Sequence, residues 1–325
     1  MVRPLYGGVG CCFCLHRVLP AEEFSSIPDN HALEIAPEAL RAMLQWVLSR
    51  GLEVISIDAV PERLARPTGR KFVCFVFDDG YRDNLVHALP IFREFQMLFA
   101  VSITNGFVEG NAPVWWYALE RLLVQSEAVQ FAWEGRKVKF PCPGRDERIV
   151  AFEAIAKMVR ACSLQTRAAL LAQIFPDDAM WRGSRLIMTW NEVRSMHNDP
   201  LVTICAHTLG HHTLNRLTEA EAFAELRDSK ADLEDQLNTP VRHLAFPFGG
   251  RNAVGDREFL LARKAGFQMA FTTRGGNLFA AHQHFLDRLP RWSVSGNRDL
   301  FRLLSASDSG LPTACEYRGR RVVTD

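Results

Sequence analysis

No run of apolar residues in this 325-residue chain approaches the roughly 20 residues that a membrane-spanning helix needs. The first eight residues also lack the apolar stretch of a secretory signal peptide. Positive and negative charges nearly balance, with a formal net charge of +1. This balance neither requires nor excludes a nucleic acid or a membrane surface as a partner. The sequence shows no internal repeat. These absences favour a globular protein that acts in the cytoplasm.

The eight cysteines do not indicate a disulfide-stabilised protein. In a strand, Cys12 and Cys14 would face one side and Cys11 the other, so the three cannot bind one ion together. A reduced, buried state is expected for the five cysteines inside apolar, strand-like runs: Cys11, Cys12, Cys14, Cys74 and Cys205.

Short apolar runs alternate with amphipathic segments along most of the chain. Pro37–Arg50 places apolar residues on one helical face and ends before Gly51, and Thr218–Leu237 begins with the capping-box spacing of Thr218 and Glu221. Alternating strands and helices predict an α/β fold with a mostly parallel sheet, either open or closed into a barrel. The predicted strands are Val9–Leu15, Val54–Ile57, Phe72–Phe77, Leu98–Ile103, Leu201–Cys205, His243–Phe246, Gln268–Thr272 and Phe285–Leu289.

Residues 113–185 interrupt this alternation and predict a mainly helical insertion. Its expected elements are the helices Trp115–Val124, Glu147–Cys162 and Gln165–Ile174 and a hairpin, Gln130–Phe140, that turns at Glu134-Gly135. The aromatic residues 115–117 fit either a sugar-stacking platform or ordinary packing. Residues 308–325 lack periodicity, and we expect a solvated tail. The main domain would then comprise residues 1–307.

Two adjacent carboxylates end one of the apolar runs. Asp78 and Asp79 directly follow Phe72–Phe77 and precede Gly80. The carboxyl ends of central parallel strands are where α/β proteins place their active sites. Neighbouring carboxylates repel each other unless a cation or a shared proton relieves them, although one of the two could simply cap a helix.

A histidine pair ends another run. His207 and His211 follow the strand predicted at Leu201–Cys205, and their i, i+4 spacing lets both side chains bind one metal ion. His212 is an alternative ligand that this spacing disfavours. A metal site is therefore the preferred interpretation over two structural histidines.

Two further strand ends carry weaker signals. The turn after His243–Phe246 supplies no side-chain ligand, but the backbone N–H of Phe248 could point towards a developing oxyanion. His16 follows the first strand, where it fits a catalytic acid or a structural histidine equally well.

These motifs together resemble the pattern of the polysaccharide deacetylases of the NodB-homology type, carbohydrate esterase family 4. That pattern reads Thr-Phe-Asp-Asp-Gly, then His-Ser/Thr-x-x-His, then a Pro-Tyr turn. Its counterparts occur here in the same order at Val76–Gly80, His207–His211 and Phe246–Gly249. The resemblance runs from about Val9 to Leu289 apart from the insertion, and it implies a distorted (β/α) barrel.

The resemblance also implies a role for each matching residue. Asp78 corresponds to the general base that activates the attacking water. Asp79, His207 and His211 correspond to the ligands of a divalent metal, and the Phe248 amide would share the oxyanion with that metal. Zn²⁺ is the expected ion, with Co²⁺, Ni²⁺ and Fe²⁺ left open by the ligand types.

Two departures from the usual family pattern stand out. The arginine expected two residues before Pro247 is replaced by Ala245, so Arg288 or Arg291 is expected to take its place beside Asp78. The late Leu-x-x-His acid is also missing. A subgroup of the family uses an early histidine in a His-Arg-Val context instead, and the match to His16 predicts that His16 is the general acid.

The resemblance implies a metal-dependent hydrolase that removes an N-acetyl group from an amino sugar of a saccharide or of a lipid-linked precursor of a surface polysaccharide. The expected partner is this sugar and no nucleic acid, in the cytoplasm or at the inner face of the membrane. The alternatives are action on another C–N bond or on O-acetyl esters, and an inactive sugar-binding module. The sequence does not indicate the oligomeric state.

Overall fold

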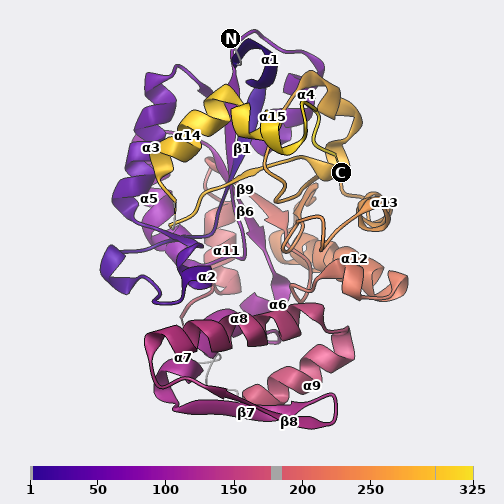
Figure 1. Ribbon diagram of the computed structural model, residues 1–325. Helices are drawn as coiled ribbons and strands as arrows, with labels where there is room; N and C mark the ends of the chain where they lie inside the picture. The colour runs from indigo at the N-terminus through magenta and orange to yellow at the C-terminus, as the bar shows by residue number, and fades with distance from the viewer. Residues whose placement is uncertain (1–2, 177–184, 297, 325) are drawn as a thin grey trace.

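The computed structural model describes residues 3–176, 185–296 and 298–324 and is built around one parallel sheet (Figure 1). Its strands follow the order β11-β10-β9-β6-β5-β1-β12, and β4 pairs with β5 beside this path. All pairings between these strands are parallel. The strands are β1 Gly10–Leu15, β4 Glu53–Val54, β5 Phe72–Phe77, β6 Phe99–Ile103, β9 Val202–Ala206, β10 His243–Ala245, β11 Met269–Phe271 and β12 Trp292–Ser293.

A single segment joins the two edges of this sheet. Leu289 forms a parallel bridge with Phe271 of β11. Three residues later, β12 pairs with β1 at Phe13 and Cys14. This segment therefore links both edges of the curled sheet, and the predicted distorted (β/α) barrel is confirmed.

The two faces of each strand pack into different layers. In β5, Phe75 and Phe77 pack outwards against the surrounding helices. Cys74 and Val76 alternate with them and face the barrel interior. Continuous apolar runs suit strands that are covered on both sides, and all six residues of β5 are buried. The cysteines expected to be buried in these strands are buried and free of disulfides.

Helices cover the outside of the barrel. In α3, Pro37–Ser49, the predicted apolar face of Leu40, Met43, Leu44 and Val47 is buried. The predicted capping box of Thr218 and Glu221 opens α12, Glu219–Leu237. The other elements of the main domain are α2 Pro28–His31, α4 Val60–Ala65, α5 Leu89–Phe95, α6 Asn105–Glu109, α11 Trp190–His197, α13 Asp256–Lys264, and a small sheet of β2 Arg17–Val18 and β3 Glu34–Ile35.

The insertion forms a layer of its own beyond α6, at the carboxyl end of the strands (Figure 1). The predicted helices and hairpin are confirmed, and the turn places Glu134 and Gly135 at positive φ. The elements pack around an apolar core that includes Trp115 and Phe152. They are α7 Trp115–Gln125, β7 Ala128–Trp133, β8 Arg136–Pro141, α8 Arg145–Ala161 and α9 Leu164–Ile174. The rest of the predicted insertion includes residues 177–184, which lie outside the described residues.

The strand predicted at Phe285–Leu289 is wrong. This segment forms the short 3₁₀ helix Leu286–Arg288, which follows another at Ala280–His284, and the pairing strand comes later as β12. The physical reason lies in the charged side chains within the segment. Asp287 and Arg288 form ion pairs at the surface with Arg263 and Asp256, so only Leu289 enters the sheet.

The solvated tail predicted for residues 308–325 is also wrong. The chain continues through α14, Leu300–Ser309, into α15, Leu311–Glu316, and then buries Tyr317 and Val323. Both helices contact α1, Arg3–Tyr6, at the end of the molecule opposite the insertion (Figure 1). A helix as short as α15 shows little periodicity in the sequence, and tertiary packing stabilises it. Nowhere in the described ranges is a helix long and apolar enough to cross a membrane.

Candidate active site and metal centre

The strand register brings the predicted site residues to one edge of the barrel. Leu15 of β1 pairs with Phe77 of β5, and the Asp78 N–H donates to the Leu15 carbonyl at 2.8 Å. Ile103 of β6 pairs with Ala206 of β9 in the same way, just before His207. The residues that directly follow these strands, including Asp78 and His207, therefore lie at the same edge of the sheet.

Three predicted ligands converge in the interior of this edge. The Asp79 Oδ1 atom lies 3.3 Å from His207 Nε2 and 3.2 Å from His211 Nε2. The three residues are 2%, 2% and 5% exposed. Among the described residues, none donates a hydrogen bond of good geometry to Asp79 Oδ1. A buried carboxylate oxygen in this state is costly unless a cation neutralises it.

The histidine ring orientations suit the same cation. His207 Nδ1 lies 2.7 Å from the carbonyl oxygen of Ala245, so Nδ1 carries the proton and the Nε2 lone pair faces Asp79. Burial lowers the pKa of His211 to about 4, which keeps this imidazole neutral and able to bind metal. Burial also lowers the pKa of His207, but the nearby carboxylates of Asp78 and Asp79 raise it by more, so that a proton and a metal ion compete for His207. One carboxylate and two imidazoles with this geometry fit a divalent ion such as Zn²⁺.

Backbone strain is concentrated in the loops that carry these residues. Four non-glycine residues of the site have positive φ: Asp79 (76°), Thr208 (64°), His211 (53°) and Phe248 (60°). Such conformations cost about 1–3 kcal/mol each and persist only where the surroundings enforce them. The fold therefore imposes the conformation of these loops at a cost in stability.

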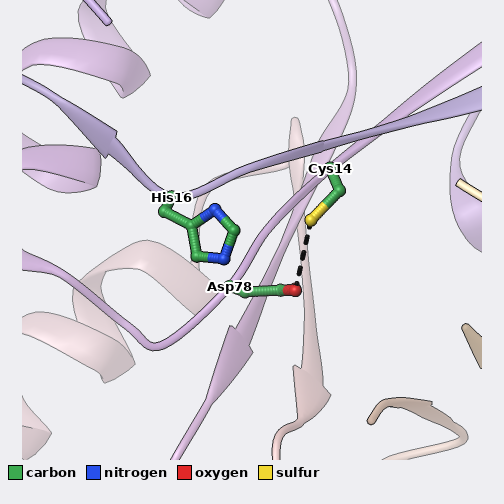
Figure 2. Close-up of side chains that lie close together, drawn as sticks. All are labelled: Cys14, His16 and Asp78. Atoms are coloured by element: carbon green, nitrogen blue, oxygen red, sulfur yellow. Dashed lines mark hydrogen bonds between the residues drawn. The ribbon is translucent and has the colours of Figure 1, made fainter. Parts of the chain in front are cut away.

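Asp78 lies beside the three ligands but forms a different set of contacts. Arg291 donates to both of its oxygens at 2.8 Å. Ser102 Oγ donates to Oδ1 at 2.7 Å, and Cys14 Sγ lies 3.3 Å from Oδ2 (Figure 2). Burial raises the pKa of the Asp78 carboxyl group, but the Arg291 guanidinium lowers it by more, so the pKa lies below its usual range. Of the two predicted arginines, Arg291 lies beside Asp78, and Arg288 pairs with Asp256 and Asp287 instead.

His16 faces the same carboxylate from the neighbouring strand (Figure 2). A ring nitrogen of His16, the Cys14 sulfur and an Asp78 oxygen all lie within 4.8 Å of one another. Burial lowers the pKa of His16 below its ordinary value, and the carboxylates of Asp79 and Asp78 oppose this shift. His16 therefore lies next to Asp78, because β1 pairs directly with β5.

The Phe248 backbone N–H is free to bind a substrate oxygen. Among the described residues, none accepts a hydrogen bond from it, whereas the Phe248 carbonyl accepts from Gly250 N and Thr273 Oγ1. The Phe248 ring lies 4.8 Å from the His211 ring, between centroids. The turn that carries this amide is therefore packed directly against a predicted metal ligand.

Comparisons with known proteins agree with this fold. Residues 152–270 match the sequence model of the polysaccharide deacetylase family. The chain is 22% identical, in an alignment 301 residues long, to the poly-beta-1,6-N-acetyl-D-glucosamine N-deacetylase of Escherichia coli (strain K12). The alignment covers 84% of this chain and 35% of that relative's length. The resemblance to the polysaccharide deacetylases is therefore confirmed.

Solved structures support the polysaccharide deacetylase fold over nearly the whole chain. The Streptococcus pyogenes deacetylase PplD, in complex with acetate, superimposes with a TM-score of 0.59 at 18% identity, covering 91% of this chain and 96% of that one. IcaB from Ammonifex degensii gives a TM-score of 0.59 at 17% identity, covering 94% and 98%. The family model begins after Asp78 and Asp79, so the placement of these two residues rests on the geometry.

Several residues of this deacetylase-like site were not anticipated from the sequence. Ser102 and Cys14 donate to Asp78, and Arg167 of the insertion contacts the loop of His211. Ser102 could have been noticed as the one polar residue within the apolar run of β6. His212, the alternative ligand, contacts Arg167 and is not part of the group that Asp79 forms with His207 and His211. Trp115 and Trp116 pack within the protein, since they are 1% and 6% exposed, whereas Tyr117 is only partly buried.

Proposed function

We propose that the protein is a metal-dependent carbohydrate deacetylase that hydrolyses the N-acetyl group of an amino sugar, in a saccharide or a lipid-linked precursor of a surface polysaccharide. The observation that carries this proposal is the convergence of Asp79 Oδ1, His207 Nε2 and His211 Nε2 beside the ion-paired Asp78. The family match and the named relatives support an acetyl group on a sugar as the substrate. A location inside the cell stays a prediction.

A divalent cation held by Asp79, His207 and His211 would act as a Lewis acid on the acetyl carbonyl and on the attacking water. The chain's own groups supply the remaining chemistry. Asp78 accepts a proton from the water, and the Phe248 N–H donates to the oxygen that becomes negative. Arg291 keeps Asp78 ionised and holds its carboxylate plane in place.

His16 would protonate the departing amine, which is a very poor leaving group as an anion. Because burial lowers its pKa, His16 is mainly neutral before the reaction begins. It must therefore gain a proton during the cycle. An oxygen of Asp78 lies within 4.8 Å of a ring nitrogen of His16. Asp78 would hold the proton taken from water, so it is the neighbouring group that can transfer a proton to His16.

Replacing His16 by alanine should lower turnover by about 10²–10⁴-fold, the contribution of a positioned acid, and leave metal content unchanged. The test compares acetate release and bound metal in the variant and the wild type. Replacement of the exposed His284 is the matched control. Near wild-type turnover in His16→Ala would show that another group is the acid.

Cys14 occupies the most weakly held position on Asp78. A carboxylate offers about four lone-pair positions, and Arg291, Ser102 and Cys14 fill all four, so one donor must yield when Asp78 accepts a proton. The thiol is the weakest donor of the three. Cys14→Ser should lower turnover several-fold, since a hydroxyl holds a carboxylate more tightly, whereas Cys14→Ala should retain it. Steady-state kinetics of the two variants test this role of Cys14. Lower turnover in the alanine variant alone would contradict the role.

Acetate release from a panel of N-acetylated oligosaccharides, measured with the metal content of the purified protein, tests the proposed function. O-acetylated sugars and cyclic ureides are the controls for related hydrolases of this fold. Metal-dependent acetate release from the N-acetyl substrates alone is the expected result. Sugar binding without release of acetate would indicate an inactive binding module instead.

A further inference from the structure

The loop that carries both predicted histidine ligands has a conformation that it would not adopt alone. It runs from His207 to His212 directly after β9, with positive φ at Thr208 and His211. Thr208 is β-branched, and such residues are rarely found at positive φ. Contacts from outside the loop must therefore hold it in place.

The barrel supplies one set of these contacts. Glu225 of α12 accepts the Gly210 N–H at 2.7 Å through Oε2, and its backbone carbonyl accepts the Leu209 N–H at 3.2 Å. The Gly106 N–H donates to the Leu209 carbonyl at 2.8 Å. These bonds fix the first half of the loop, up to Gly210.

The insertion supplies the contacts to the second half. Arg167 of α9 donates through Nη1 to the His211 carbonyl at 2.8 Å and contacts His212 Nδ1 at 2.9 Å. Because a guanidinium can only donate, His212 Nδ1 accepts, and the proton of this imidazole is on Nε2, which faces Glu225 Oε1 at 3.8 Å. Arg167 is only 5% exposed, so this arrangement is shielded from water.

The loop is packed so closely here that it has little freedom to adjust. A Cβ atom on Gly210 would meet His212 Nε2 at 2.7 Å and Cδ2 at 2.9 Å. On the other side, the Trp116 ring of α7 lies 5.2 Å from the His211 ring, between centroids. His211 is thus enclosed by two helices of the insertion, α7 at its ring and α9 at its backbone.

We propose that Arg167 is a positioning residue for the metal site and that the insertion holds the His207–His212 loop in its metal-binding conformation. The metal part of this inference rests on the proposed function, whereas the holding of the loop does not. A buried cation near a metal site repels the metal, so electrostatics alone would predict tighter binding when Arg167 is removed. The positioning role predicts weaker binding, and the sign of the effect separates the two.

The test compares Arg167→Met with the wild type after both have been stripped of metal and titrated with Zn²⁺ against a competing chelator. Arg167→Met should bind Zn²⁺ about 10- to 100-fold more weakly, the usual effect of losing a group that orients a ligand. Arg160→Met is the matched control, because Arg160 lies in α8 of the same insertion and pairs with Asp29 instead of the loop. Its affinity should equal that of the wild type.

Hydrogen exchange of the metal-free proteins gives a second readout. Backbone amides of residues 207–212 should exchange faster in Arg167→Met than in the wild type, with no change in the barrel strands. Equal or tighter Zn²⁺ binding together with unchanged exchange would overturn the proposal. If the methionine variant does not fold, Arg167→Lys is tested instead, because it retains the buried charge with a shorter reach. A Zn²⁺ affinity and an amide exchange rate equal to those of the wild type would then contradict the positioning role. A wild type that binds no Zn²⁺ would refute the metal site. The hydrogen-exchange comparison would still test whether Arg167 holds the loop.

Discussion

Asp78→Asn should lower turnover by about 10²–10⁴-fold while the protein retains its metal. The amide keeps nearly the same shape but cannot accept a proton from water. Asp79, His207 and His211 are untouched, and none of the hydrogen bonds to Asp78 involves them. The measurement combines acetate release with elemental analysis of the purified variant.

The same substitution should also destabilise the fold. Arg291 is fully buried and its guanidinium donates to both oxygens of Asp78, so the variant leaves a buried cation without its counter-ion. Breaking a buried pair in this way typically costs about 3–5 kcal/mol. Thermal unfolding would show this loss separately from the kinetic one. Asp79→Asn is the comparison: if it keeps metal while Asp78→Asn loses metal, the two carboxylate roles are reversed.

His207→Ala or His211→Ala should abolish both metal binding and turnover. Each substitution removes one of three converging ligands, and the remaining two hold a divalent ion weakly. Elemental analysis and acetate release on the same preparations measure both effects. His284→Ala again serves as the control, since His284 is exposed. Full metal content in either site variant would end the metal hypothesis for these residues.

A lower pH should also weaken metal binding. The pKa of His207 lies above its ordinary value of 6.5 in the metal-free protein, so the protonated form that cannot bind metal accumulates as the pH falls through this raised pKa. Zn²⁺ affinity should therefore decline on acidification from neutral pH. An affinity that does not change between pH 8 and 5.5 would contradict this assignment of His207.

The sequence by itself determined the parts of this protein that depend on short, local patterns. Apolar runs of strand length predicted most of the barrel strands, and helical spacing predicted α3, α12 and the helices of the insertion. Asp78, Asp79, His207 and His211 could be identified because each follows a strand, and parallel strands must end at a common edge. His16 was found for the same reason.

Tertiary structure alone decided which distant groups complete the site. Arg291 is 213 residues from Asp78, and the choice between two candidate arginines depended on where the segment of Leu289 and β12 joins the sheet. Arg167 reaches the His211 loop from an insertion whose sequence shows only amphipathic helices. The last helix, α15, packs against α1, and its six residues are too few to show a helical period in the sequence. In each case the deciding interaction joins segments far apart in the chain, and local propensity carries no information about such contacts.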